Sequence, residues 1–112
     1  MNILITGGSG YLGARLGYFL STNGFNITIL CKAIPKNIIG WRNQIKDLII
    51  GDITHKNTLE KIFEKKPDII IHLISLNKEM SKKSDEIIDV NVKSTWALLQ
   101  KATLFNVKKF IY

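Results

Sequence analysis

Short apolar runs alternate with longer stretches of helical periodicity along the whole chain. The runs that predict strands cover residues 2–6, 26–31, 48–50, 69–74 and 107–112. Apolar residues at three- and four-residue spacing predict helices over residues 11–23 and 58–66, and a long helix before the last strand. Strands that alternate with helices predict an α/β fold: a doubly wound parallel sheet of five strands with right-handed crossovers, most simply in the order 3-2-1-4-5.

Details of the pattern refine individual elements. Residues 32–44 have weak periodicity and predict a loop that carries a short helix. The almost unbroken apolar run at 69–74 predicts a strand that is covered on both faces. Ser81 or Ser84 is the predicted N-cap of the long helix. The predicted buried stripe of that helix consists of Ile88, Val92, Trp96, Leu99, Ala102 and Phe105.

Three glycines at three-residue spacing, Gly7, Gly10 and Gly13, lie between the first predicted strand and the first predicted helix. Gly7 lets the chain turn off the strand, and Gly10 removes a side chain where a pyrophosphate would approach the start of the helix. Gly13 lets the helix pack close to the sheet. Because the turn sits inside a βαβ unit, we expect dinucleotide binding; a purely structural turn is the alternative.

Composition excludes several classes of protein. The 112 residues, 46% of them hydrophobic and 22% charged, predict one globular domain over residues 1–112. The net charge is +7, but the lysines are spread along the chain, which favours a solvated surface over a nucleic-acid partner. No apolar run approaches the roughly 20 residues of a membrane helix. The single cysteine, Cys31, excludes an internal disulfide and a multi-cysteine metal site, so we expect a cytoplasmic protein.

Further motifs follow the glycine turn in a familiar order. Residues 6–13 match the pattern T-G-x-x-G-x-x-G, and residues 51–53 read Gly-Asp-Ile after the third strand. Residues 68–73 fit D-x-(V/I)-I-H-(L/F), residues 91–95 resemble N-V-x-G-T, and residues 107–112 fit a fifth strand. Together these segments resemble the extended short-chain dehydrogenase/reductase family, the NAD(P)-dependent epimerases and dehydratases that act largely on nucleotide sugars. The resemblance covers essentially the whole chain and implies a Rossmann-type fold.

The resemblance also implies roles for individual residues. Asp52 would bind the adenine amino group beside the Ile53 backbone, and Asn91 would contact the cofactor or order a water. Each has a structural alternative: a loop carboxylate or helix cap for Asp52, and an ordinary buried amide for Asn91. His72 is more simply an interior histidine with satisfied hydrogen bonds, and His55 a solvated loop residue. The predicted cofactor-binding residues are Gly7, Gly10, Tyr11, Leu12, Gly13, Lys32, Asp52, Ile53, Leu73, Ile74, Ser75 and Asn91.

Two departures from the family pattern bear on the cofactor. The second strand ends in Cys31-Lys32, where an acidic residue would bind the ribose hydroxyls of NAD. The Lys32 ammonium suits the 2′-phosphate of NADP, so NADP is favoured over NAD; a plain surface lysine is the alternative. Ser94 replaces a smaller glycine, and Ile74-Ser75 replaces a smaller pair, so we expect a narrower nicotinamide side of the pocket.

The family's catalytic pair, a tyrosine and a lysine four residues later, is absent from this sequence. Tyr11 is followed at that spacing by Arg15, Tyr18 by Thr22, and Tyr112 is the last residue. We therefore expect an N-terminal portion, truncated before the catalytic helix, that binds cofactor but is inactive alone. Its uncovered sheet edge predicts marginal stability or a homo-oligomer.

Two other functions stay open beside the cofactor-binding portion of a nucleotide-sugar enzyme. The first is a noncatalytic module that senses NAD(P). The second, weaker interpretation is a basic domain that binds polyanions, which a steep salt dependence of oligonucleotide affinity would support.

Overall fold

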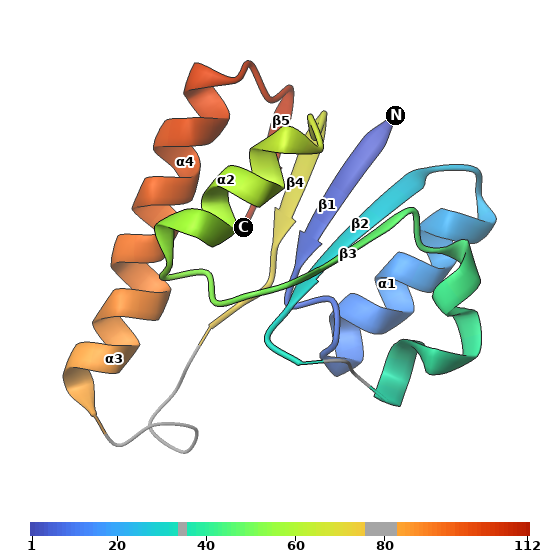
Figure 1. The fold of residues 1–112 in the computed structure, drawn as a ribbon, viewed down its shortest axis with the longest axis horizontal. Coiled ribbons are helices and arrows are strands. Elements are labelled where there is room, and N and C mark those ends of the chain that lie inside the picture. The colour runs from blue at the N-terminus through green and yellow to red at the C-terminus, as the bar shows by residue number, and fades with distance from the viewer. Residues whose placement is uncertain (34–35, 76–82) are drawn as a thin grey trace.

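Five parallel strands form one sheet in the described part of the chain, which in this computed structural model is residues 1–33, 36–75 and 83–112 (Figure 1). Their order is β3-β2-β1-β4-β5, as predicted. β1 lies in the centre and pairs with β2 and β4, so that Thr6 is level with both Leu30 and His72. The strands are β1 (Asn2–Thr6), β2 (Asn26–Cys31), β3 (Asp47–Ile50), β4 (Ile69–His72) and β5 (Lys109–Ile111).

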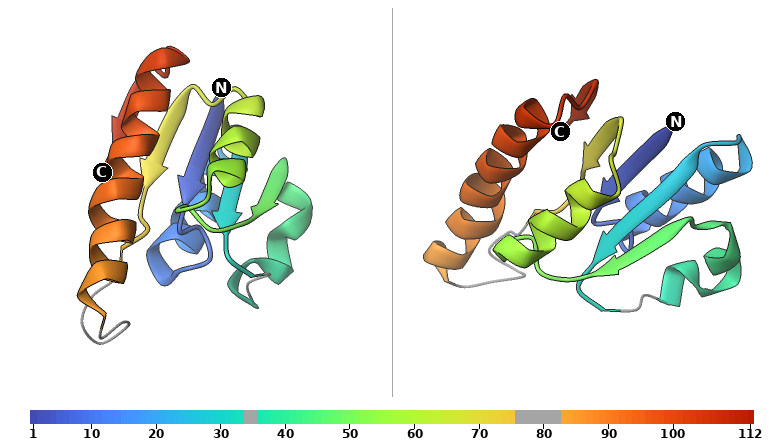
Figure 2. Two further views of the ribbon diagram at one scale, coloured as in Figure 1. Left: turned by 60° about the vertical axis from the view of Figure 1, so that its left-hand side comes forward. Right: turned by 45° about the horizontal axis from the view of Figure 1, so that its top comes forward.

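Helices cover both faces of this sheet (Figure 2). One face carries α1 and η1, and the other carries α2, α3 and α4. A π-helical turn, η2, joins α3 directly to α4. The helical segments are α1 (Tyr11–Thr22), η1 (Lys36–Gln44), α2 (Lys56–Glu64), α3 (Ser84–Ile88), η2 (Asp89–Lys93) and α4 (Ser94–Leu104).

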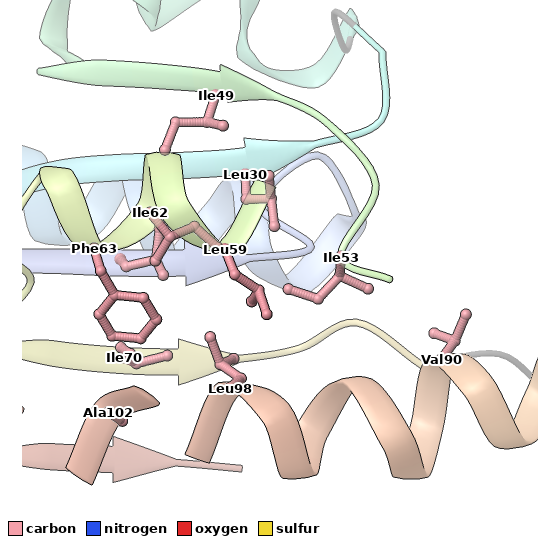
Figure 3. Close-up of a cluster of buried hydrophobic side chains, with 11 residues drawn as sticks. Leu30, Ile49, Ile53, Leu59, Ile62, Phe63, Ile70, Val90, Leu98 and Ala102 are labelled. Atoms are coloured by element: carbon pink, nitrogen blue, oxygen red, sulfur yellow. The ribbon is translucent and has the colours of Figure 1, made fainter. Parts of the chain in front are cut away.

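Alternate residues of the central strands point into two separate cores, because neighbouring side chains on a strand face opposite ways. Ile3 and Ile5 join the core under α1 and η1, whereas Leu4 joins the core under α2 and α4. Figure 3 shows the second core, in which Ile62 of α2 and Leu98 of α4 are fully buried. Burial on both faces explains why the strands read as continuous apolar runs.

The predicted buried stripe of the last helix is wrong, except at Ala102. Val92 and Trp96 are 59% and 63% exposed, and the buried face instead consists of Val90, Ser94, Leu98 and Ala102. A prediction from hydrophobicity alone excludes a buried face that contains a serine. Ser94 can nevertheless be buried, because its hydroxyl donates a hydrogen bond to the Val90 carbonyl. The π turn changes the number of residues per turn, so a stripe extended at α-helical spacing does not stay on one face across it. The other exposed residues of the predicted stripe are Ile88, Leu99 and Phe105.

Several element boundaries also differ from the prediction, among them the end of β4 and the start of α3. β4 ends at His72 rather than at residue 74, because its partner β1 ends at Thr6, where the chain turns away. Leu73 still donates its N–H to the Thr6 carbonyl at 3.1 Å, and then leaves the sheet. The N-cap position of α3 is Lys83 and not Ser84, with no side-chain cap bond, and Ser81 lies outside the described residues.

Candidate functional site

The glycine turn begins where β1 ends. Gly7 has φ +74°, a left-handed conformation that side chains rarely adopt, and its N–H donates to the Leu30 carbonyl of β2 at 3.2 Å. A Cβ on Gly7 would lie 3.1 Å from the Ile74 nitrogen, so the turn also passes close to the exit of β4. The turn therefore needs glycine here both for its backbone conformation and for this approach.

Gly13 and Gly10 differ in what a side chain would meet. A Cβ on Gly13 would clash with the Gly7 carbonyl oxygen and lie 2.8 Å from the Gly8 Cα, so only glycine lets α1 rest on the turn. A Cβ on Gly10 would meet only the Gly7 oxygen, at an ordinary 3.4 Å. The fold therefore requires Gly13, whereas Gly10 opens onto free space at the start of α1.

The start of α1 is suited to hold an anion. The first N–H groups of a helix, here those of Tyr11, Leu12 and Gly13, have no carbonyl partner within the helix. The first turn carries no acidic side chain, so the positive end of the helix dipole is not neutralised within α1. The bare backbone at Gly10 gives a phosphate group access to these donors.

A cavity of about 290 Å³ lies in front of the turn, at the carboxyl ends of the central strands. It extends across the sheet from β3 and β2, over the glycine turn, to the segment after β4. The predicted site residues that line it are Gly7, Gly10, Lys32, Ile53, Leu73, Ile74 and Ser75. The same cavity is lined by residues that the sequence did not single out for binding, namely Ser9, Leu30, Cys31, Gly51 and Val90.

The remaining predicted residues do not line this cavity. Leu12 is 63% exposed, and Gly13 is buried beneath the turn. Tyr11 borders a separate hollow between α1 and η1, where the Arg15 guanidinium stacks on its ring at 4.3 Å. Asn91 lies half-buried in η2, next to the cavity-lining Val90. The sequence did not identify Val90 as a cavity residue, because it reaches the cavity only through the tertiary packing of η2.

Asp52 and Lys32 form an ion pair across the ends of β3 and β2, with 3.6 Å between Asp52 Oδ2 and Lys32 Nζ. The other carboxylate oxygen, Oδ1, accepts hydrogen bonds from the Thr54 N–H at 2.9 Å and the Thr54 hydroxyl at 2.7 Å. Burial acts to raise the pKa of Asp52, but Thr54, the Lys32 ammonium and His55 together outweigh it and hold the pKa below its usual value. The carboxylate is therefore charged and fixed in orientation.

His72 ties three cavity-forming segments together through a chain of buried and partly buried hydrogen bonds. The Thr95 hydroxyl donates to the Asn91 carbonyl at 2.9 Å, so its oxygen accepts from His72 Nε2, also at 2.9 Å. The Thr6 hydroxyl then donates to His72 Nδ1 at 2.6 Å and accepts from the Leu73 N–H at 3.2 Å. This assignment of protons satisfies every group and makes His72 neutral, with its proton on Nε2.

The surroundings of His72 agree with a neutral ring. Its side chain is 2% exposed, and burial lowers its pKa to about 4. The Tyr112 ring stacks against it at 5.6 Å between centroids. His72 is thus an interior histidine whose hydrogen bonds are satisfied, as the simpler interpretation of the sequence had it.

Cys31 is the one cysteine of the sequence, and it lines the cavity. Burial raises the pKa of the Cys31 thiol, which therefore stays protonated where it lines the cavity. Among the described residues, no three side chains of His, Cys, Asp or Glu lie together in a way that could hold a metal ion. Over the same residues, no helix has the length and apolar character needed to cross a bilayer.

Several known proteins resemble this chain in sequence. A profile of the NAD dependent epimerase/dehydratase family matches residues 3–112. The UDP-glucose 4-epimerase of Yersinia enterocolitica is 33% identical over 121 residues, which cover all of this chain and 36% of the epimerase. The dTDP-D-glucose 4,6-dehydratase of Dictyostelium discoideum is 36% identical over 120 residues, which cover 98% of this chain and 28% of the dehydratase.

Solved structures show the same fold. An epimerase from Methanothermobacter thermautotrophicus superposes with a TM-score of 0.87 at 29% identity, over 99% of this chain and 34% of that one. The Bordetella bronchiseptica enzyme WbmG in complex with NAD gives 0.85 at 26% identity, over 98% of this chain and 36% of that one. The chain spans only about a third of the length of the curated relatives that it matches.

Proposed function

Because this chain belongs to the NAD-dependent epimerase/dehydratase family, we propose that it is the dinucleotide-binding portion of an enzyme that epimerises, dehydrates or reduces a nucleotide sugar. One observation carries the proposal: the glycine turn leaves the backbone of Gly10 bare where the cavity meets the start of α1, whose first N–H groups have no carbonyl partner within the helix. A fold that needed only a tight turn would not require bare backbone at that position. The WbmG complex with NAD is a solved relative of the same fold.

In this proposal the two halves of the dinucleotide would lie on either side of the turn. The pyrophosphate would lie against Gly10 and the first N–H groups of α1, over the end of β1. In this fold the adenosine half lies at the end of β2, where Lys32 and Asp52 are found. The other half would then extend along Leu73, Ile74 and Ser75. Burial between these apolar walls and Val90 would exclude water from the cofactor.

The bound nicotinamide would supply reversible hydride transfer to and from a sugar carbon. The residues of this chain hold and orient the cofactor, and the Thr6, His72 and Thr95 hydrogen bonds keep the ends of β1 and β4 and the η2 turn in place around it. The sequence contains no tyrosine followed four residues later by lysine, so we expect no turnover by this chain alone.

The adenosine end of the site favours NADP over NAD. No carboxylate follows β2, and the Lys32 side chain, which is 67% exposed, lies where a 2′-phosphate would be bound. An ammonium group attracts a phosphate dianion and offers no acceptor to a pair of ribose hydroxyls. NADP preference is therefore part of this proposal.

Calorimetric titration with NAD and NADP tests the proposal. We expect both to bind, with NADP the tighter, and Gly10→Val to abolish binding because its side chain fills the phosphate cradle. Gly40→Val is the matched control, because a Cβ on Gly40 meets nothing within 4 Å, and Gly40 lies in η1 and does not line the cavity. If the folded wild-type chain binds neither dinucleotide, or if Gly10→Val binds as well as wild type, the proposal is wrong.

A further inference from the structure

Lys32 and Asp52 are drawn together by the pairing of β2 and β3. Cys31 and Ile50 are register partners at the ends of these strands, and the Gly51 N–H donates to the Cys31 carbonyl at 2.9 Å. Lys32 directly follows Cys31, and Asp52 is the second residue after Ile50, so both emerge at the same end of the β2–β3 pair. The Lys32 ammonium, which could bind a 2′-phosphate, therefore lies beside the Asp52 carboxylate.

We propose that Asp52 sets the choice between NADP and NAD by holding the Lys32 ammonium, which a 2′-phosphate must take from the carboxylate oxygen Oδ2. This inference rests on the proposed function and goes beyond it, because it makes Asp52 a specificity-determining residue that acts through Lys32. In the absence of a 2′-phosphate, Lys32 stays on Asp52. When NADP binds, the ammonium moves to the phosphate and Oδ2 becomes free.

The geometry of the carboxylate supports this competition. Thr54 occupies Oδ1 with two hydrogen bonds and so fixes the plane of the group, which leaves Oδ2 as the oxygen that faces Lys32. The 3.6 Å separation is longer than a charge-assisted hydrogen bond, and the lysine side chain is mostly exposed. An exposed pair of this kind is weak, so a phosphate dianion can displace the carboxylate.

Freed Oδ2 can accept a hydrogen bond, and an adenine amino group is a donor. Such a bond would strengthen NADP and NAD binding through the same contact, because a carboxylate oxygen has two lone pairs and can accept from the adenine amino group whether or not Lys32 is paired with it. The carboxylate is also an anion near the phosphate, and direct repulsion would weaken NADP binding without any help from Lys32. The experiment must therefore separate a Lys32-dependent effect from these two contributions.

The readout is the ratio of the NAD and NADP dissociation constants, measured by calorimetry at low ionic strength. Asp52→Asn keeps an acceptor oxygen for Thr54 and removes only the charge, so the fold is retained. We expect this variant to raise the preference for NADP by about two- to fivefold, the range that an exposed ion pair allows. Any contribution of Asp52 that strengthens NAD and NADP binding equally cancels in the ratio of the two dissociation constants. Added salt should reduce the effect, because it screens the exposed pair.

Lys32→Gln provides the second arm. It should lower the NADP preference, and adding Asp52→Asn to it should change the ratio no further. The control Asp47→Asn breaks a similar ion pair, Asp47 with Lys65 at 3.2 Å, at the opposite end of β3, and should leave the ratio unchanged. An unchanged ratio in Asp52→Asn, or an equal rise in the Lys32→Gln background, overturns the inference while leaving dinucleotide binding intact. If neither dinucleotide binds the folded wild-type chain, the proposed function fails and the inference falls with it.

Discussion

At the scale of single residues, the glycine turn separates the demands of folding from those of binding. Gly13 contacts backbone atoms of Gly7 and Gly8, which cannot rotate away, whereas Gly10 faces open space. Both positions belong to one sequence motif, so a count of glycines does not tell them apart. Only the distances around each Cα show which of them the fold itself requires.

The first prediction follows from this difference. Gly13→Ala should lower the free energy of unfolding by about 2–3 kcal/mol, since overpacking against rigid backbone outweighs the gain of about 1 kcal/mol in helix propensity. Gly10→Ala should stay within about 1 kcal/mol of wild type, because alanine is only a poorer N-cap. Urea denaturation measures both. Equal losses in the two variants would contradict the assignment.

His72 yields a prediction about pH. Its pKa in the folded chain is about 4, below the 6.5 of a free imidazole, so the unfolded chain binds the proton more tightly. The stability that depends on neutral His72 is fully present above pH 6.5 and falls as the pH drops from 6.5 toward 4. The slope approaches about 1.4 kcal/mol per pH unit and adds up to roughly 3 kcal/mol.

Thermal unfolding between pH 4 and 8 checks this expectation. His72→Gln should be less stable than wild type at pH 7 but should lose the part of the slope that His72 contributes. His55→Gln, which removes an exposed imidazole, is the control. If wild type and His72→Gln lose stability in parallel as the pH falls, the buried neutral histidine is not the cause.

At the scale of elements, the strands and the presence of a long last helix could be predicted, but the buried face of that helix could not. Strands buried on both faces are apolar throughout, so the runs at β1, β2 and β4 are unambiguous. The helical face depends on the π turn at η2, which shifts the residues after it and has no apolar signature of its own. The burial of Ser94 could not be predicted from its residue type, because it depends on a hydrogen bond to the Val90 carbonyl one turn earlier.

The candidate site divides in a similar way. The glycine motif and the strand ends could be found from spacing, and they do surround one cavity. The pairing of Lys32 with Asp52 was missed, because each residue was considered alone as a cofactor ligand. The predicted strand order already made β2 and β3 neighbours, so Lys32 and Asp52, one and two residues beyond the ends of these strands, could have been expected to meet. Val90, in contrast, reaches the cavity only through the packing of η2.

Leu98 and Leu99 test the corrected face of α4. Leu98 is fully buried between α2 and the sheet, whereas Leu99 belongs to the predicted stripe and is 36% exposed. Leu98→Ala should cost about 2–5 kcal/mol of unfolding free energy, as truncation of a buried leucine does. Leu99→Ala should cost less than about 1 kcal/mol, because the residue leaves no enclosed cavity. If chemical denaturation shows equal losses of unfolding free energy in the two variants, the corrected buried face of α4 is wrong.

At the scale of the whole molecule, large apolar side chains remain on the outer layers. On α1 these are Leu12 and Phe19, at 63% and 61% exposed. Along η2 and α4, Val92 and Trp96 follow one another at four-residue spacing, with Ile88 before them and Leu99 after. A row of this kind on one helical surface is more continuous than the isolated positions of α1. Exposed apolar rows favour association.

We therefore expect the isolated chain to self-associate through the face made by η2 and α4. Sedimentation velocity over a range of protein concentrations should show a species larger than one chain, and Trp96→Glu should shift it toward the monomer because a buried carboxylate without a partner is costly. Phe19→Glu places the same charge on α1 and should leave the association unchanged. A wild-type chain that stays monomeric at every concentration, or an equal response to both substitutions, would show that this face does not drive association. Since neither residue lines the dinucleotide cavity, cofactor affinity should be the same in both variants, which separates assembly from binding.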